Sequence, residues 1–381
     1  MCSARMIAAI GLLACSAGGA QAKDPVIPLV AMTVENGNFV GEEEGSPAVD
    51  VSGMACVRAQ GATRNCLVIN DENKGAQFAA IRNDRMTVGK VIPLIGNARD
   101  PDSFGSPPDE ECGEEGKFKN MDGEGVAYAA RFFYVVGSHG CSRKKDKFQL
   151  SSFILARVSV DSQGRPVDAA GRVLGEEEFS KAVQTTYRVS DWLQRAKGVK
   201  HFFAENLEED DGLNIEGVAV QGDRIWFGLR APVKKASKDG KKFKKQAFIV
   251  GGDVAELFEQ GHEPSKAKPK VAFFDLHQRG IRDLAALPDG RLLVLAGAPN
   301  GDEVPFKLFV ADPERNTAKL IGMLPEVQGK GKDKNGRDKV VTGKAEGVTL
   351  MEVEAGSAQA VILFDSLLNG APHIAKFTIP D

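Results

Sequence analysis

The sequence NIEGVAVQGDRIWFGLR, residues 214–230, has the pattern of a strand, a tight turn and a second strand. Apolar residues on both sides of the turn Gln221-Gly222-Asp223 predict an antiparallel hairpin. The acid Glu216 lies near the start of the first strand, and the base Arg230 lies at the end of the second. In such a hairpin these two positions are at the same end, so we expect the two charges to be neighbours.

The same pattern returns imperfectly in four other places, residues 51–71, 122–139, 281–296 and 345–365. A glycine follows the entry residue in each copy except the fourth, where Asp283 takes the glycine position. Self-similarity of this kind predicts a repeat architecture, and each interval is long enough for a four-stranded blade of roughly 40–50 residues.

The repeats predict an all-β fold, a five-bladed β-propeller. Six blades remain an alternative if the long second interval contains a degenerate blade. The last blade is one strand short, and the apolar segment Val26–Val34 is spare, so we expect this N-terminal strand to complete the blade and close the ring. Residues 174–211 have a helical pattern and predict a short helical insertion.

The chain has 381 residues and a formal net charge of -3. This balance predicts no global attraction to nucleic acid or to an anionic membrane. We expect residues 23–381 to form a single propeller domain, which is a size that large all-β domains reach. We expect the protein to be a monomer that binds a small anionic or polar ligand.

The N-terminus has the features of a targeting segment. Arg5 is followed by the apolar run 6–14 and by the small-residue site Ala20-Gln21-Ala22, which predicts a signal peptide over residues 1–22. The apolar run is too short to span a bilayer. We therefore expect an exported protein, periplasmic or secreted. The alternative is a lipoprotein acylated on Cys15.

Four cysteines follow the predicted signal peptide, and an oxidising compartment favours disulfides between them. Cys56 and Cys66 lie on the two arms of one predicted hairpin and could pair across it, which would leave Cys112 and Cys141 to pair with each other. Three connectivities are possible, and the sequence does not choose between them. Short spacing typical of zinc ligands is missing from all four.

The first strand of each blade lines the central channel of a propeller, so residues near the strand entries should gather at one mouth. These entry residues are Ser52, Glu124, Glu216, Arg282 and Glu346. Residues after the second strands should surround them, and these are Asp71, Glu72, His139, Arg230 and Asp365. Three glutamates near one axis repel one another unless a cation or neighbouring basic groups compensate.

The three glutamates suggest a metal site of Glu124, Glu216 and Glu346 for a hard cation such as Ca²⁺. The alternative is that each glutamate pairs with an arginine or a backbone amide of the next blade and links the blades. His139 and Glu216 are the candidate catalytic groups, with His139 expected on an exposed loop end. The candidate substrate-binding residues are Asp71, Arg143, Arg230, Arg282 and Asp365.

Several of these segments resemble the bacterial domain of unknown function family 3616. The resemblance rests on Gly137-Ser138-His139 with Arg143-Lys144, on residues 215–219 with 228–232, and on residues 282–285, and it extends from about Val51 to the C-terminus. The Glu-Gly-hydrophobic-Ala repeat is also similar to phytase-like and gluconolactonase-like propellers. That similarity implies calcium and channel ligands at Glu124, Glu216 and Glu346, although Ser52 and Arg282 leave the carboxylate ring incomplete.

Two functions follow from these observations. The first is a metal-assisted hydrolase, phosphoesterase-like or lactonase-like, acting on a phosphorylated or ester-containing small molecule at the channel mouth. The second is a non-catalytic propeller that binds a ligand or a protein on the same face. Convergence of the three glutamates within metal-ligand distance favours the first, and pairing of each with an arginine favours the second.

Overall fold

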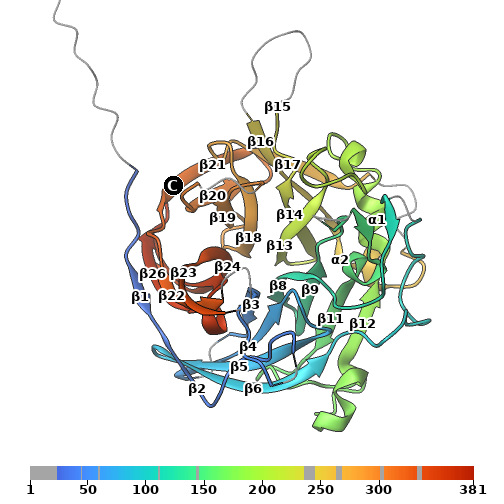
Figure 1. The fold of residues 1–381 in the computed structure, drawn as a ribbon, viewed down its shortest axis with the longest axis horizontal. Helices are drawn as coiled ribbons and strands as arrows, with labels where there is room; N and C mark the ends of the chain where they lie inside the picture. Colours follow the sequence, from blue (N-terminus) through green and yellow to red (C-terminus); the bar gives the residue numbers. More distant parts are fainter. Residues whose placement is uncertain are drawn as a thin grey trace, which may run out of the picture.

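The computed structural model describes residues 24–43, 45–58, 61–109, 112–142, 146–235, 245–262, 268–300, 304–332 and 337–381. Five antiparallel sheets are arranged around a common centre (Figure 1), which confirms the all-β, five-bladed propeller. The predicted signal peptide, 1–22, and Cys15 lie outside the described residues. None of the helices in the described part of the chain has the length and hydropathy needed to cross a membrane.

Each blade starts with its innermost strand at the centre, and later strands lie progressively farther out. The first blade contains β3 (Val51–Cys56), β4 (Thr63–Asn70), β5 (Gly75–Arg82) and β6 (Arg85–Pro93). The second contains β8 (Gly123–Ala129), β9 (Phe132–Gly137), β11 (Leu155–Ser159) and β12 (Val183–Thr186). The third contains β13 (Asn214–Gln221), β14 (Arg224–Ala231), β16 (Lys245–Asp253) and β17 (Lys270–Phe274), and the short β15 (Lys234–Lys235) pairs with β16.

The fourth blade contains β18 (Gly280–Ala286), β19 (Leu292–Gly297), β20 (Lys307–Asp312) and β21 (Thr317–Met323). The fifth contains β24 (Lys344–Glu354), β25 (Ser357–Asp365) and β26 (His373–Thr378). Two small ribbons lie outside the blades: β7 (Glu114–Glu115) with β10 (Lys147–Phe148), and β22 (Gln328–Lys332) with β23 (Asp338–Thr342). The helices are short: η1 (Leu150–Phe153), η2 (Glu176–Ala182), α1 (Arg188–Leu193), η3 (Lys200–Phe202), α2 (Val254–Phe258) and η4 (Leu368–Gly370).

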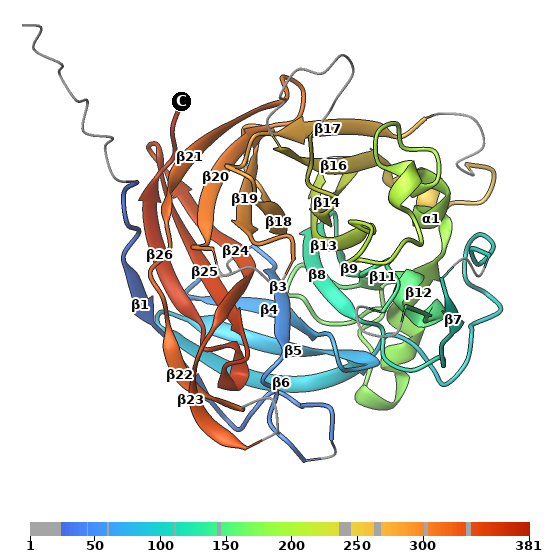
Figure 2. The ribbon, with the colours of Figure 1, turned by 45° about the horizontal axis from the view of Figure 1, so that its top comes forward.

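The N-terminal segment runs along the outer edges of three blades, as the blue trace in Figure 2 shows. Val26 forms a bridge with Met323 of the fourth blade. β1 (Leu29–Ala31) then pairs with β26 as the fourth strand of the fifth blade, and β2 (Thr33–Glu35) pairs with β6 of the first. The predicted single strand Val26–Val34 is therefore divided into two short strands, because the segment passes from one sheet to the next. That it closes the ring stays a prediction.

The predicted helical insertion at 174–211 is only partly helical. It contains η2, α1 and η3, but it also contains β12, the outer strand of the second blade. β-Branched residues and alternation are weak signals in a strand of four residues, so the strand was missed. Disulfides join Cys56 to Cys66 across the first hairpin and Cys112 to Cys141, which confirms the pairing that the hairpin suggested.

The apolar core lies between neighbouring blades. Trp226 packs with residues of the fourth blade such as Ile281 and Leu284, and Tyr134 is buried among residues of the second and third blades. Both aromatic side chains therefore pack between blades, as their places in second strands predict.

The innermost strands approach one another so closely that a side chain at the contact would crowd its neighbours. A Cβ atom on Gly53 would lie 3.2 Å from the Cα of Gly125, and one on Gly125 would lie 3.3 Å from the Cα of Gly217. A Cβ on Gly217 would lie 2.9 Å from the Cα of Asp283, and one on Gly347 would lie 3.4 Å from the Cα of Gly53. The glycine of the repeated motif is thus explained by packing around the axis.

Asp283 fills the one position of this ring without a glycine. Its buried carboxylate accepts hydrogen bonds from the backbone N–H of Leu284 (2.8 Å) and of Val348 in the fifth blade (2.7 Å). The side chain therefore links the fourth and fifth blades where the other blades touch through glycine.

We predict that Gly217→Ala lowers the free energy of unfolding by about 1–3 kcal/mol, because the new methyl group would clash with the backbone of Asp283 and Leu284. Urea unfolding measures this. Gly175→Ala is the control, since a Cβ there meets no atom within 4 Å. Equal stability of the two variants would contradict the close-packed ring.

Candidate functional site at the channel mouth

All five innermost strands contain a one-residue irregularity at the same place. The register shifts occur between Val51 and Gly53, Gly123 and Gly125, Ile215 and Gly217, Ile281 and Asp283, and Ala345 and Gly347. A bulge leaves one residue unpaired and redirects its side chain. The skipped residues are the five expected at the mouth: Ser52, Glu124, Glu216, Arg282 and Glu346.

Two buried arginines hold two of the glutamates. Arg230 Nη1 donates to Glu216 Oε1 at 2.7 Å, and Arg282 Nε lies 3.3 Å from Glu216 Oε2. Arg282 Nη2 also pairs with Glu346, so one guanidinium connects two blades. Burial lowers the pKa of Arg282 to about 10, which still leaves it charged at neutral pH. The result is a chain of ion pairs, Arg230–Glu216–Arg282–Glu346, across the third, fourth and fifth blades.

This network does not fit the calcium site suggested by the sequence. The oxygens of Glu216 and Glu346 already bind guanidinium groups, which supply the positive charge that a metal would supply. Within the described ranges, no group of three or more His, Cys, Asp or Glu side chains is arranged to hold a metal ion. The arginine pairing that we considered as the alternative applies to these two glutamates.

Glu124 differs from the other two glutamates. It is half-buried, and within the described part of the chain no group hydrogen-bonds or pairs with its carboxyl. Burial raises the pKa of Glu124 well above its usual range, and the negative charges of Glu216, Asp122 and Asp71 raise it further. Glu124 is therefore a carboxyl that keeps its proton at a higher pH than an ordinary glutamate.

Further carboxylates gather on the side of the mouth formed by the first, second and fifth blades. Burial and the charges of Asp365 and Glu72 raise the pKa of Asp50 to about 6. Burial, followed by the charges of Asp122, Asp50 and Asp365, raises the pKa of Asp71 well above its usual range. Asp71 Oδ1 is buried without a hydrogen-bond partner in the described structure. On this side of the mouth, acidic side chains therefore outnumber basic ones.

Asp365 and Asp122 have partners of their own. Asp365 Oδ2 accepts from Lys344 Nζ at 3.0 Å and from Ser366 Oγ at 3.2 Å. Asp122 Oδ2 accepts a short hydrogen bond from the buried Ser138 hydroxyl.

Three of these groups were missed by the sequence reasoning: Asp50, Asp122 and Lys344. Each stands two residues before the bulged residue of its strand, Ser52, Glu124 or Glu346 respectively. The offset recurs in three repeats, and this recurrence was the usable signal, since the alternation of a regular strand does not hold across a bulge.

The predicted exposure of His139 is wrong. Its side chain is fully buried, its backbone has φ of 51°, and its Nδ1 lies 2.8 Å from the Gly137 carbonyl oxygen. The backbone turns inward here, since His139 N–H donates to the Ser152 carbonyl and the ring packs against Phe153. Nε2 has no hydrogen-bond partner in the described structure. Burial lowers the pKa of His139 to about 4, and no carboxylate contributes to that shift.

The remaining candidates are placed as follows. Arg230 and Arg282 belong to the ion-pair network, and Asp71 and Asp365 belong to the acidic side of the mouth. Arg143 lies outside the described residues, as do Lys144 and Lys145.

A model of the family described as "Protein of unknown function (DUF3616)" matches residues 113–373. No curated protein matches the chain at significant similarity. Among solved structures, the chain is similar to the α-L-arabinofuranosidase PaAbf62A from Podospora anserina, with a TM-score of 0.42, 11% identity, and coverage of 92% of this chain and 98% of that one. It is also similar to the mannose phosphorylase MPT-4 from Leishmania mexicana, with a TM-score of 0.39, 13% identity, and coverage of 93% and 89%. At these TM-scores the likenesses carry no argument about activity.

We predict that Arg282→Met destabilises the protein by about 3–5 kcal/mol, because it leaves the half-buried Glu346 unpaired and weakens the pairing of the buried Glu216. Chemical denaturation measures the loss. Lys90→Gln is the control, since it removes an exposed pair with Glu176 and should cost at most about 1 kcal/mol. A loss for Arg282→Met as small as that of the control would show that the network contributes little.

We also predict that His139 makes the fold sensitive to acid. Its pKa is about 4 when folded and 6.5 in an unfolded chain, so the unfolded state binds more protons between these values. The contribution of neutral His139 to stability is fully present above pH 6.5 and falls by about 3 kcal/mol on acidification to pH 4. His139→Asn, which tolerates the positive φ, should flatten this part of the stability–pH curve. An unchanged curve would contradict the buried neutral imidazole.

Proposed function

Since this chain belongs to the DUF3616 family of proteins of unknown function, we propose a function from its own site: hydrolysis of a small molecule at the mouth of the central channel, with Glu124 as the proton donor. The observation that carries the proposal is the contrast between two neighbouring glutamates. Glu216 is held by two arginines, whereas Glu124 has no partner among the described residues and a raised pKa. Pairs of carboxyl groups with pKa values pushed apart are typical of acid–base catalysis.

The chemistry follows from the raised pKa of Glu124, which favours its protonated form. A protonated carboxyl can donate its proton to the leaving oxygen of an ester or a glycosidic bond, while water attacks the acyl or anomeric carbon and the bond to the leaving oxygen breaks. The half-buried position keeps Glu124 accessible from the mouth, whereas the buried Glu216 acts on Glu124 through its charge.

The charges at the mouth favour a neutral or cationic substrate. The acidic groups there are Asp50, Asp71, Glu72, Asp122, Glu124, Glu216, Glu346 and Asp365, and the basic groups are Arg230, Arg282 and Lys344. Because both arginines are already paired with carboxylates, a phosphorylated substrate would meet net repulsion. We therefore propose an ester or a glycoside as the substrate. We propose neither a phosphorylated substrate nor a bound calcium ion.

A non-catalytic propeller that binds a ligand or a protein is the second candidate. It is supported by Glu216 and Glu346, whose carboxylates are used in linking blades. The two disulfides also support export to an oxidising compartment, which both candidates share.

We predict that Glu124→Gln lowers kcat/KM by about a hundredfold or more on whichever substrate of a p-nitrophenyl ester and glycoside panel the protein hydrolyses. The fall in rate at high pH, where the acid loses its proton, should disappear with it. Glu177→Gln, on the exposed first turn of η2, is the control and should leave activity unchanged. Full activity of Glu124→Gln would refute the assignment of the proton donor. Binding of a small molecule without turnover would favour the second candidate.

A further inference from the structure

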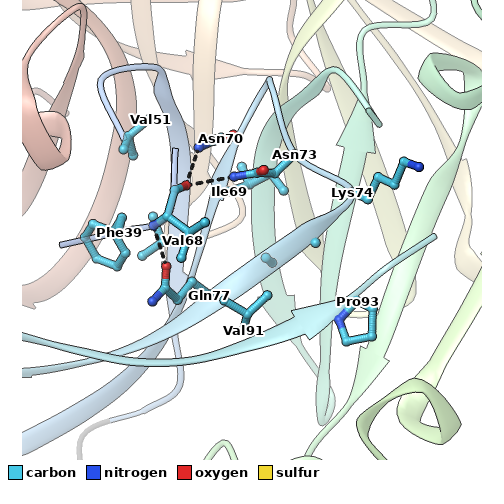
Figure 3. Close-up of a pocket in the computed structure, with 13 residues that line it drawn as sticks. Phe39, Val51, Val68, Ile69, Asn70, Asn73, Lys74, Gln77, Val91 and Pro93 are labelled. Carbon is cyan, nitrogen blue, oxygen red and sulfur yellow. Dashed lines mark hydrogen bonds between the residues drawn. The ribbon is translucent and has the colours of Figure 1, made fainter. Parts of the chain in front are cut away.

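A cavity opens over the first blade, on the side of the molecule that carries the channel mouth (Figure 3). Its volume is about 250 Å³. Its walls come from the loop at Phe39 and Val40, from the end of β4 and from the adjoining parts of β5 and β6. These strand ends belong to the end of the blade at which β3 begins, which is also the end that carries Ser52 and Asp71.

The cavity is mainly apolar and partly exposed, and the charged Lys74 in its lining donates to Asn97 Oδ1 at 2.6 Å. Its floor includes the buried side chains of Phe39, Val51 and Ile69. Its rim includes Val40 and Val91, which are 40% and 45% exposed. An apolar recess with exposed valines on its rim is favourable for a hydrophobic group that would leave water on entering.

Hydrogen bonds hold the recess in shape, as the dashed lines in Figure 3 show. The Val40 backbone N–H donates to Gln77 Oε1 at 2.9 Å, and the Val40 carbonyl accepts from Asn70 Nδ2 at 2.9 Å and Asn73 Nδ2 at 2.8 Å. Gln77 Nε2 in turn donates to the Gly89 carbonyl at 2.9 Å. These side-chain amides are occupied in fixing the loop, so the cavity is preformed and the surface it offers is mainly hydrophobic.

Asn70 connects this cavity with the acidic side of the channel mouth. Its side chain holds Val40 on the cavity side, and its Oδ1 accepts from the backbone N–H of Glu72 at 3.0 Å. Asp71, whose pKa is raised by burial and then by the other mouth carboxylates, lies between Asn70 and Glu72 in the chain. A ligand with its polar part at the mouth would therefore have an apolar recess beside it.

We propose that this cavity is a hydrophobic subsite, which takes the uncharged aliphatic or aromatic group of the small molecule bound at the channel mouth. The inference rests on the proposed function for the identity of the polar part of the ligand, which would bind at the mouth. Binding of an apolar molecule in the cavity can be tested independently of that function. The ligand class is an uncharged amphiphile, such as an ester with an apolar acyl chain, because the neighbouring carboxylates repel anions.

The test of the cavity uses the neutral fluorescent probe N-phenyl-1-naphthylamine and the full-length protein. Saturable binding is expected for the wild type, and Val40→Asp and Val91→Asp should each weaken it by about tenfold or more, because a charge would be brought against an apolar ligand. Val173→Asp is the matched control, since Val173 is 42% exposed and does not line the cavity. Failure of the wild type to bind, or equal affinities for Val91→Asp and Val173→Asp, would overturn the proposal.

The link with the mouth is tested by hydrolysis of p-nitrophenyl acetate and p-nitrophenyl butyrate. Val91→Asp should raise KM for the butyrate several-fold more than for the acetate, while kcat stays the same. Equal changes in KM for both esters would refute the role of the cavity as a subsite. If neither ester nor any other substrate is hydrolysed, the proposed function fails, and probe binding alone then decides whether the cavity binds apolar molecules.

Discussion

The contact of five backbones around one axis is the constraint on which the rest of the structure depends. A Cβ atom at Gly53, Gly125, Gly217 or Gly347 would crowd a neighbouring strand, and Asp283, at the fifth position, has a carboxylate that accepts two backbone hydrogen bonds. Strands this close bring their entry residues together, whatever those residues are. The charges at the mouth are therefore a consequence of packing, and the side chains have to accommodate one another.

The charged side chains accommodate one another in two different ways on the two sides of the mouth. Where the third, fourth and fifth blades meet, Arg230 and Arg282 neutralise Glu216 and Glu346. On the side of the first and second blades, Asp50, Asp71 and Glu124 have raised pKa values because burial disfavours their charge and negative neighbours add to the effect. One side is thus stabilised by ion pairs, whereas the carboxyl groups of the other side have raised pKa values. This division makes the mouth a candidate for acid–base chemistry.

Much of this arrangement follows from sequence alone because the motif is repeated. Five imperfect copies of the hairpin, at intervals long enough for a blade, predict a propeller, and the strand position shared by Glu124, Glu216 and Glu346 predicts that they gather at one mouth. The partner of each charge is not predictable in this way, since it depends on which blade is adjacent and how each bulge turns the side chain. His139 shows the same limit, because its burial depends on the contact of its backbone with Ser152 and the inward turn that follows β9.

The N-terminal segment has a consequence for how copies of this protein behave in solution. Its short strands cover the outer edges of β26 and β6, and Val26 covers part of β21. A sheet edge without a partner offers a row of free N–H and C=O groups to any other strand. If the N-terminal segment dissociated, the outer edges of three adjacent blades would be exposed at once. Pairing of these edges with strands of another molecule would then compete with rebinding of the protein's own N-terminal segment.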